Sequence, residues 1–197
     1  MKVSRAQAEE NRRTVVDAAG RLFREHGFDG VGLNELMRAA GLTHGGFYKQ
    51  FKSKQDLAVE ACDSLLAGSA ERWQRVATQA GGEAFPVLVR RYLSAAHRDR
   101  RADGCAFAAL GPDVARQDGG LRRSFEAGLG AHLAVLDETM HGAPQPAPSN
   151  GALAALSTMV GALLLSRMVE DDTLSRRILD AAAGALLDAP ASTASST

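Results

Sequence analysis

The sequence predicts an all-α protein, with a small N-terminal helix bundle followed by a larger helical domain. Three observations lead to this prediction. Residues that favour helix are abundant, apolar residues recur every three or four positions over most of the 197 residues, and glycine ends several of these segments. We found no alternation of apolar and polar residues long enough to indicate a strand.

The N-terminal bundle is expected to begin after a polar arm over residues 1–11. Apolar residues at helical spacing predict a first helix that runs to His26 and is ended by Gly27. The same pattern predicts a short second helix from about Leu33 to Ala40. The third helix follows almost immediately, so the three helices are closely spaced along the chain.

The junction between the second and third helices has the pattern of a helix-turn-helix unit. Gly41 suits the left-handed backbone that such a turn needs, and Thr43 can cap a third helix that contains Phe47 and Tyr48. In a helix-turn-helix unit the second helix of the pair lies in the major groove, with its first turn at the base edges. Residues 1–53 are therefore predicted to form a DNA-binding domain.

The first turn of this third helix is Thr43-His44-Gly45-Gly46. Two glycines inside a short helix cost about 1 kcal/mol each relative to alanine, so something should compensate. Their missing side chains allow close approach to another surface, which is either a DNA groove or a tight packing contact within the protein. His44 can contact a base edge or a phosphate, or it is a surface residue without a role.

Basic residues concentrate near this helix although the formal net charge of the chain is zero. The first 54 residues carry ten Lys or Arg against six acids, a local balance of 10 − 6 = +4. Tyr48, Lys49, Lys52 and Lys54 supply a hydroxyl and three cations around one short helix, which suits contacts to phosphates. A solvated basic face is the alternative for any one of these lysines.

Further helices are predicted beyond the bundle, over residues 54–80, 83–100, 119–140, 152–169 and 173–187. Between 105 and 117, Pro112 suggests a break between two short helical pieces. Residues 141–150 (HGAPQPAPSN) contain three prolines and are predicted to be a linker. We assign residues 54–189 to one regulatory domain, and we expect the Ser/Thr-rich residues 190–197 to be disordered.

The run GLTHGGFYKQFKSKQDL resembles the signature of the TetR/AcrR family of transcriptional regulators, and the resemblance extends over about Arg12 to Leu57. It implies a repressor that binds palindromic double-stranded operator DNA as a homodimer. It assigns base recognition to the first turn and phosphate contacts to Tyr48 and Lys54. The DNA-binding residues implied are Thr43, His44, Gly45, Gly46, Tyr48, Lys49, Gln50 and Lys54, with Phe47 and Phe51 in the core.

The resemblance also implies a C-terminal domain that binds a small-molecule inducer and forms the dimer through about Ala152–Leu187. The last two helices are apolar enough that they must be buried in a core or in an interface. Candidate ligand-binding residues are Trp73, Tyr92, Cys105, Phe107 and Phe125. Aromatic residues at helical spacing are also common in an ordinary core, which is the alternative for this set.

Cys105 is a separate candidate because it follows Gly104 near a predicted helix start, with several arginines close upstream. Such surroundings lower the pKa of a thiol. The run GCAFAALGPDVARQ resembles the cysteine-bearing segment of family members that respond to electrophiles or oxidants. The hypothesis is that Cys105 senses reactive species, and the alternative is a small buried apolar residue.

Other functional classes find little support in the sequence. The histidines show no spacing typical of metal ligands, and we found no nucleophile, phosphate-binding or dinucleotide motif, so an enzyme, a metal site and a cofactor are not expected. A constitutive DNA-binding protein without an inducer is the main alternative. The N-terminus is polar, and the longest uninterrupted apolar stretch, residues 159–165, is too short to span a bilayer, so a cytoplasmic location is expected.

Overall fold

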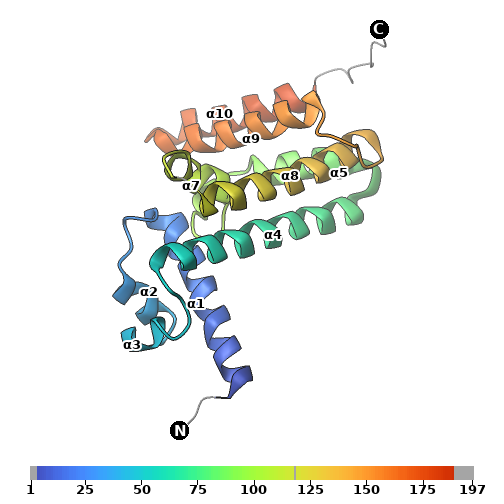
Figure 1. Cartoon of the computed structure of the whole chain (residues 1–197). Coiled ribbons are helices and arrows are strands. Elements are labelled where there is room, and N and C mark those ends of the chain that lie inside the picture. The colour runs from blue at the N-terminus through green and yellow to red at the C-terminus, as the bar shows by residue number, and fades with distance from the viewer. Residues whose placement is uncertain (1–3, 118, 189–197) are drawn as a thin grey trace. The chain divides into compact units, whose positions relative to one another are not determined.

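The computed structural model describes residues 4–117 and 119–188, and within these ranges all regular secondary structure is helical, which confirms the predicted all-α class (Figure 1). The elements are α1 (Arg5–His26), α2 (Leu33–Ala39), α3 (His44–Phe47), α4 (Lys54–Ala80), the 3-10 helix η1 (Gly81–Glu83), α5 (Ala84–Tyr92), α6 (Ala95–Asp99), α7 (Ala106–Ala115), α8 (Gly120–His141), α9 (Asn150–Met168) and α10 (Asp172–Leu187).

The helices divide into two compact units. The first contains the residues up to Arg72 together with Arg100–Ala131, and the second contains Trp73–Asp99 and the residues from His132 onward. Residues of α7 and α8 belong to the first unit because they complete the core that α1 and α4 begin. The domain boundary expected between residues 53 and 54 remains a prediction, and the expected disordered tail lies outside the described residues.

The first helix is longer than the sequence suggested. The polar arm expected over residues 1–11 is wrong from Arg5 onward, because α1 already begins there. Ser4 caps the helix by accepting a hydrogen bond from the backbone N–H of Gln7 at 3.1 Å. Arg5 and Glu9 form an i,i+4 ion pair. Polar residues thus continue a helix whose apolar face starts only at Val15.

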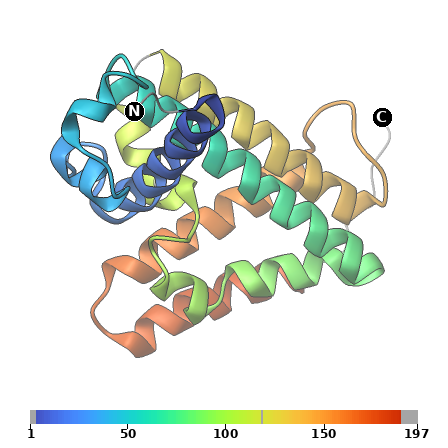
Figure 2. The ribbon, with the colours of Figure 1, turned by 90° about the horizontal axis from the view of Figure 1, so that it is seen from below.

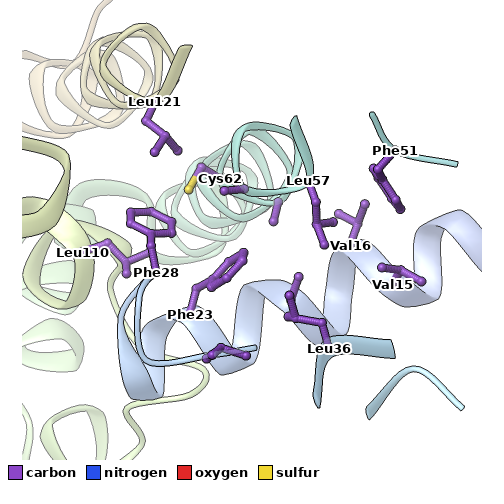
Figure 3. Packing of buried hydrophobic residues seen from close by; sticks show 14 of the residues in the cluster. Val15, Val16, Phe23, Phe28, Leu36, Phe51, Leu57, Cys62, Leu110 and Leu121 are labelled. Atoms are coloured by element: carbon purple, nitrogen blue, oxygen red, sulfur yellow. The ribbon is translucent and has the colours of Figure 1, made fainter. Parts of the chain in front are cut away.

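The core of the first unit lies between α1, α2 and α4 and extends to α7 and α8. Figure 3 shows its side chains converging from helices and loops far apart in the sequence, including Val15, Val16, Phe23, Phe28, Leu36, Phe51, Leu57, Cys62, Leu110 and Leu121. Burial of one such side chain stabilises the fold by about 1.5–3 kcal/mol. This core holds α2 and α3 against α1, so the helix-turn-helix segment has a fixed support.

Two helix predictions need correction. The helix expected over residues 83–100 is interrupted after Tyr92, and α6 begins anew at Ala95. Leu93 leaves helical geometry, with ψ at 40°, and the Ser94 hydroxyl accepts a hydrogen bond from the N–H of His97 at 3.2 Å. A local side-chain cap therefore competes with continuation of the helix.

The break expected at Pro112 is also wrong, since α7 runs through it from Ala106 to Ala115. Proline removes one backbone hydrogen bond from a helix. Leu110 and Val114 flank the proline and are both buried in the core of the first unit. The burial of these two side chains offsets the lost hydrogen bond. The spacing of residues in the sequence did not indicate this burial.

In the second unit, α9 and α10 lie side by side as a helical hairpin (Figure 2). Ser149 and Asp171 cap their N-termini through side-chain hydrogen bonds. The predicted linker leads into this hairpin and is anchored where the N–H of Ser149 donates to the buried carboxylate of Asp137 at 3.1 Å. By length and composition alone, the whole of α9 could span a membrane. The core helix of a soluble protein meets the same two criteria, so this is weak evidence for a membrane span.

Candidate nucleic-acid interface

The turn between α2 and α3 has the geometry that its sequence predicts. Gly41 has a φ of +69°, the left-handed conformation that glycine adopts without strain. The N–H of Leu42 donates to the carbonyl of Met37 at 2.9 Å and closes the end of α2. Thr43 occupies the cap position of α3, but its side chain accepts no capping hydrogen bond, so the predicted capping role of its hydroxyl is wrong.

The first turn of α3 is open to solvent. Thr43, His44 and Gly45 are exposed. A Cβ atom built on Gly45 would meet nothing within 4 Å, and one on Gly46 would meet only Met37 and Thr43, each at 3.8 Å. Tight packing within the chain therefore does not explain the paired glycines.

The single turn of α3 separates its residues into an inner and an outer face. Phe47 is fully buried and stacks on the buried Phe51, with ring centroids 5.4 Å apart, as the resemblance implied for both residues. Tyr48 is 66% exposed. Its ring contacts Phe47 and His44 edge to face, at 5.2 and 6.0 Å between centroids. The tyrosine is therefore braced by aromatic neighbours while its surface faces solvent.

α3 ends at Phe47, earlier than expected, and a turn over Tyr48–Gln50 follows. The N–H groups of Gln50 and Phe51 both donate to the carbonyl of Phe47, at 2.8 and 3.0 Å. Lys49 lies exposed on this turn. The side-chain oxygen of Gln50 is buried and has no hydrogen-bond partner among the described residues.

The lysines that follow differ in their surroundings. Lys52 is exposed, whereas Lys54 is partly buried and its ammonium group donates to the backbone carbonyl of Phe28. Lys54 thus ties the start of α4 to the loop after α1. The hydroxyl of Ser53 accepts from the N–H of Asp56 at 3.0 Å and caps α4.

Arg12 is part of this region in a way that sequence reasoning missed. In the sequence, Arg12 is only one of the ten basic residues near the N-terminus. The structure places its guanidinium against Glu60 of α4, the carbonyl of Gln50 and the ring of Phe51. Its partners are 38 to 48 residues away in sequence. No local sequence signal could have revealed these contacts.

The candidate ligand-binding residues fall into the two separate units. In the second unit, the Trp73 ring contacts Tyr92 and His132 edge to face, at 5.8 and 4.9 Å between centroids. His132 is nearly fully buried, and His97 contacts Tyr92 at 4.7 Å. Sequence spacing did not indicate that the two histidines join the aromatic residues.

The remaining three candidates lie in the first unit. Phe107 and Phe125 are edge to face at 5.7 Å between centroids. Cys105 is half-buried at the N-cap position of α7. The buried guanidinium of Arg24 interacts electrostatically with it, and desolvation lowers the pKa of that arginine. Cys105 therefore has an arginine of α1 in its surroundings, in addition to the arginines close to it in sequence.

The two cysteines are not joined by a disulfide bond and differ in environment. Cys62 is fully buried in the core of the first unit. Burial raises the pKa of its thiol to about 12, and the charge of Asp63 adds to the effect. Cys62 is therefore a neutral packing residue at physiological pH.

The helix-turn-helix segment has relatives among known proteins. Residues 15–61 match the family model of bacterial regulatory proteins, tetR family. Residues 15–61 are therefore similar to the DNA-binding segment of the TetR family. The HTH-type transcriptional regulator AcrR of Shigella flexneri is 40% identical to this chain over 57 residues, which are 29% of this chain and 26% of AcrR.

Another relative is an uncharacterized HTH-type transcriptional regulator of Haemophilus influenzae, 34% identical over 90 residues, which are 44% of each chain. The matched segments thus span less than half the length of these curated relatives.

Solved structures match nearly the whole chain. The reduced form of Escherichia coli NemR superposes with a TM-score of 0.79 at 19% identity, covering 94% of this chain and 99% of NemR. A TetR transcriptional regulator from Chloroflexus aurantiacus gives a TM-score of 0.75 at 23% identity, covering 92% and 96%. FadR from Bacillus subtilis, in complex with stearoyl-CoA, gives 0.67 at 16% identity, covering 89% and 97%. The chain therefore has the fold of these TetR-family structures.

Proposed function

We propose that this chain is a transcriptional regulator of the TetR family that binds duplex operator DNA through Thr43–Gln50 and the start of α4. The observation that carries the proposal is the open space around Gly45. An alanine would cost nothing there sterically and would favour the helix by about 1 kcal/mol. A surface that must come close to a large partner explains why the side chain is absent.

The neighbouring residues suit the same partner. Exposed Tyr48 offers a hydroxyl, and exposed Lys49 and Lys52 offer cations, which are typical donors to phosphates. Base recognition is assigned to the exposed first turn of α3, Thr43 to Gly46. For Gln50 and Lys54, a contact to DNA requires that each side chain change its present surroundings.

The regulator is proposed to act as a homodimer through α9 and α10. Large apolar side chains are exposed on this hairpin, among them Leu165 at 53% and Met168 at 69%. Leu153 and Leu174 are also exposed. Exposed apolar side chains on neighbouring helices are typical of a protein interface. A two-fold dimer would present two recognition segments to a palindromic operator.

We further propose that a small-molecule inducer releases this regulator from DNA, so that it acts as a repressor in the cytoplasm. Trp73, Tyr92, Phe107 and Phe125 remain candidates for ligand contact. An electrophile acting on Cys105 is a second form of inducer, supported by the electrostatic interaction of Cys105 with the buried Arg24. A constitutive DNA-binding protein is the alternative, and we do not propose an enzyme.

The test of DNA binding uses fluorescence anisotropy with a library of palindromic duplexes. Wild type is compared with Gly45→Leu, and with Gly130→Leu as the matched control, because Gly130 is an exposed helical glycine that also has nothing within 4 Å of a built Cβ. We expect selective binding by wild type and Gly130→Leu, with a loss of at least about 100-fold for Gly45→Leu. Equal binding by both variants would show that the surface at Gly45 does not approach DNA closely.

The test of an inducer uses the selected duplex. A compound that lowers the affinity for DNA indicates regulation, since an effector changes affinity by about 5–150-fold in typical cases. Cys105→Ser is treated with an electrophile beside wild type. If the variant releases DNA as wild type does, the cysteine hypothesis fails, and if no compound acts, the constitutive alternative is favoured.

A further inference from the structure

Arg12 connects three elements of the first unit. Its Nε donates to Glu60 Oε1 at 2.8 Å, and its Nη2 makes a second contact with the same carboxylate. Nη1 donates to the backbone carbonyl of Gln50. The guanidinium carbon lies 4.3 Å from the centre of the Phe51 ring. One side chain of α1 therefore holds both α4 and the turn after α3.

This set of contacts requires a guanidinium. A flat group with donors on two edges can bind a carboxylate with one edge, donate to a carbonyl with another and stack on an aromatic ring. Lysine has a single ammonium group and cannot reproduce all of these contacts. The pairing with Glu60 also neutralises the charge of Arg12, which lowers its attraction for phosphate.

The carbonyl of Gln50 is a decisive point of attachment. It lies at the end of the turn that carries Tyr48 and Lys49. At the beginning of this turn, the carbonyl of Phe47 accepts hydrogen bonds from two later N–H groups. The side-chain oxygen of Gln50 forms no hydrogen bond within the described part of the chain, so at Gln50 the link to α1 is made by the backbone carbonyl. The N–H groups of Gln50 and Phe51 hold the turn to Phe47, and Arg12 adds a side-chain bond that ties the same end to α1.

We propose that Arg12 and Glu60 are positioning residues for DNA recognition, which hold the turn of Tyr48 and Lys49 in its binding geometry without contacting DNA themselves. The inference rests on the proposed function, since it concerns the same surface. Arg12 orients the turn by its bond to the Gln50 carbonyl. Glu60 orients Arg12.

The experiment measures binding to the selected duplex over a salt series for Arg12→Met, Arg12→Lys and Glu60→Gln. We expect Arg12→Met to bind about tenfold more weakly, the equivalent of one hydrogen bond to a charged group, with an unchanged slope of log affinity against log salt. Arg12→Lys should recover part of the affinity. Glu60→Gln should bind slightly more weakly than wild type, again with an unchanged slope.

The matched control is Arg13→Lys, since Arg13 is exposed and forms an ion pair with Glu10 of its own helix. We expect it to bind as wild type does. Amide hydrogen exchange supplies a readout that does not need DNA. It should accelerate at residues 48–51 in Arg12→Met and stay unchanged in the centre of α4.

Three results would overturn the inference. A salt slope that falls by about 0.9 in Arg12→Met, together with tighter binding by Glu60→Gln, would make Arg12 a phosphate ligand. Unchanged affinity in Arg12→Met, with only a lower unfolding midpoint, would make its role purely structural. If wild type itself binds no duplex selectively, the proposed function fails first and this inference fails with it.

Discussion

The α3 segment and the α9–α10 hairpin both present surface to solvent, but with opposite chemistry. α3 is four residues long, buries its one large apolar residue, Phe47, and exposes Thr43, His44 and Gly45. α9 is 19 residues long, buries one apolar face and still exposes Leu165 and Met168. The first surface exposes polar and small residues and one aromatic ring with a hydroxyl, Tyr48, whereas the second exposes purely apolar side chains.

The difference indicates different partners. Apolar surface removed from water contributes about 25 cal/mol per Å², so the hairpin gains by covering its exposed leucines and methionine with another apolar surface. A second copy of the chain offers the same surface. The α3 segment gains nothing of this kind, and its exposed polar groups and small residues suit a polar, charged groove.

Phe47→Ala should have the largest effect on stability. It removes a fully buried ring from the core between α3 and α1, and such changes cost about 3–5 kcal/mol in the free energy of unfolding. Tyr48→Ala is the control one residue away, and should cost far less because Tyr48 is mostly exposed. Urea unfolding measures both, and equal losses would contradict the division of α3 into an inner and an outer face.

Met168→Glu should have the next largest effect, on assembly. A carboxylate placed in an apolar interface must lose its hydration, so we expect the dimer to weaken by about 100-fold or more. Sedimentation velocity over a concentration series measures the change. Ala134→Glu, at an exposed position of α8, is the control. A monomeric wild type would show that the apolar surface of the hairpin has another partner.

Tyr48→Phe should have a smaller effect, confined to DNA. Loss of one hydroxyl that donates to a phosphate costs about 1 kcal/mol, or roughly fivefold in affinity. The ring contacts with Phe47 and His44 remain, so the unfolding midpoint should not change. Anisotropy and urea unfolding are measured on the same preparation. An unchanged affinity for DNA would show that the Tyr48 hydroxyl does not contact DNA.

The smallest effect concerns the polar start of α10. Hydrogen bonds from Arg176 and Arg98 lower the pKa of Asp172 below its ordinary value of 3.8. A lowered folded-state pKa gives stability that is present above pH 3.8 and is lost as the pH falls through the folded value. Asp172→Asn should thus be slightly less stable than wild type at pH 7 and equal to it at the lowest pH. A constant difference in urea midpoint from pH 7 to below pH 3.8 would contradict this.

The sequence by itself determined the local features of this protein. Helical spacing and glycine positions predicted α2, α4, α8, α9 and α10 closely, and Gly41 has the left-handed conformation that the turn was expected to need. The burial of Phe47 and Phe51 also followed from the resemblance. These features depend on residues a few positions apart, whose backbone preferences act before any tertiary contact forms.

Only the tertiary structure decided the features that depend on distant partners. α7 continues through Pro112 because the first unit buries the residues on both sides of it. Lys54 reaches a carbonyl 26 residues earlier, and Arg12 reaches α4 across 48 residues. A side chain's partner across such distances is fixed by how helices pack, and the spacing of residues along one helix carries no information about it.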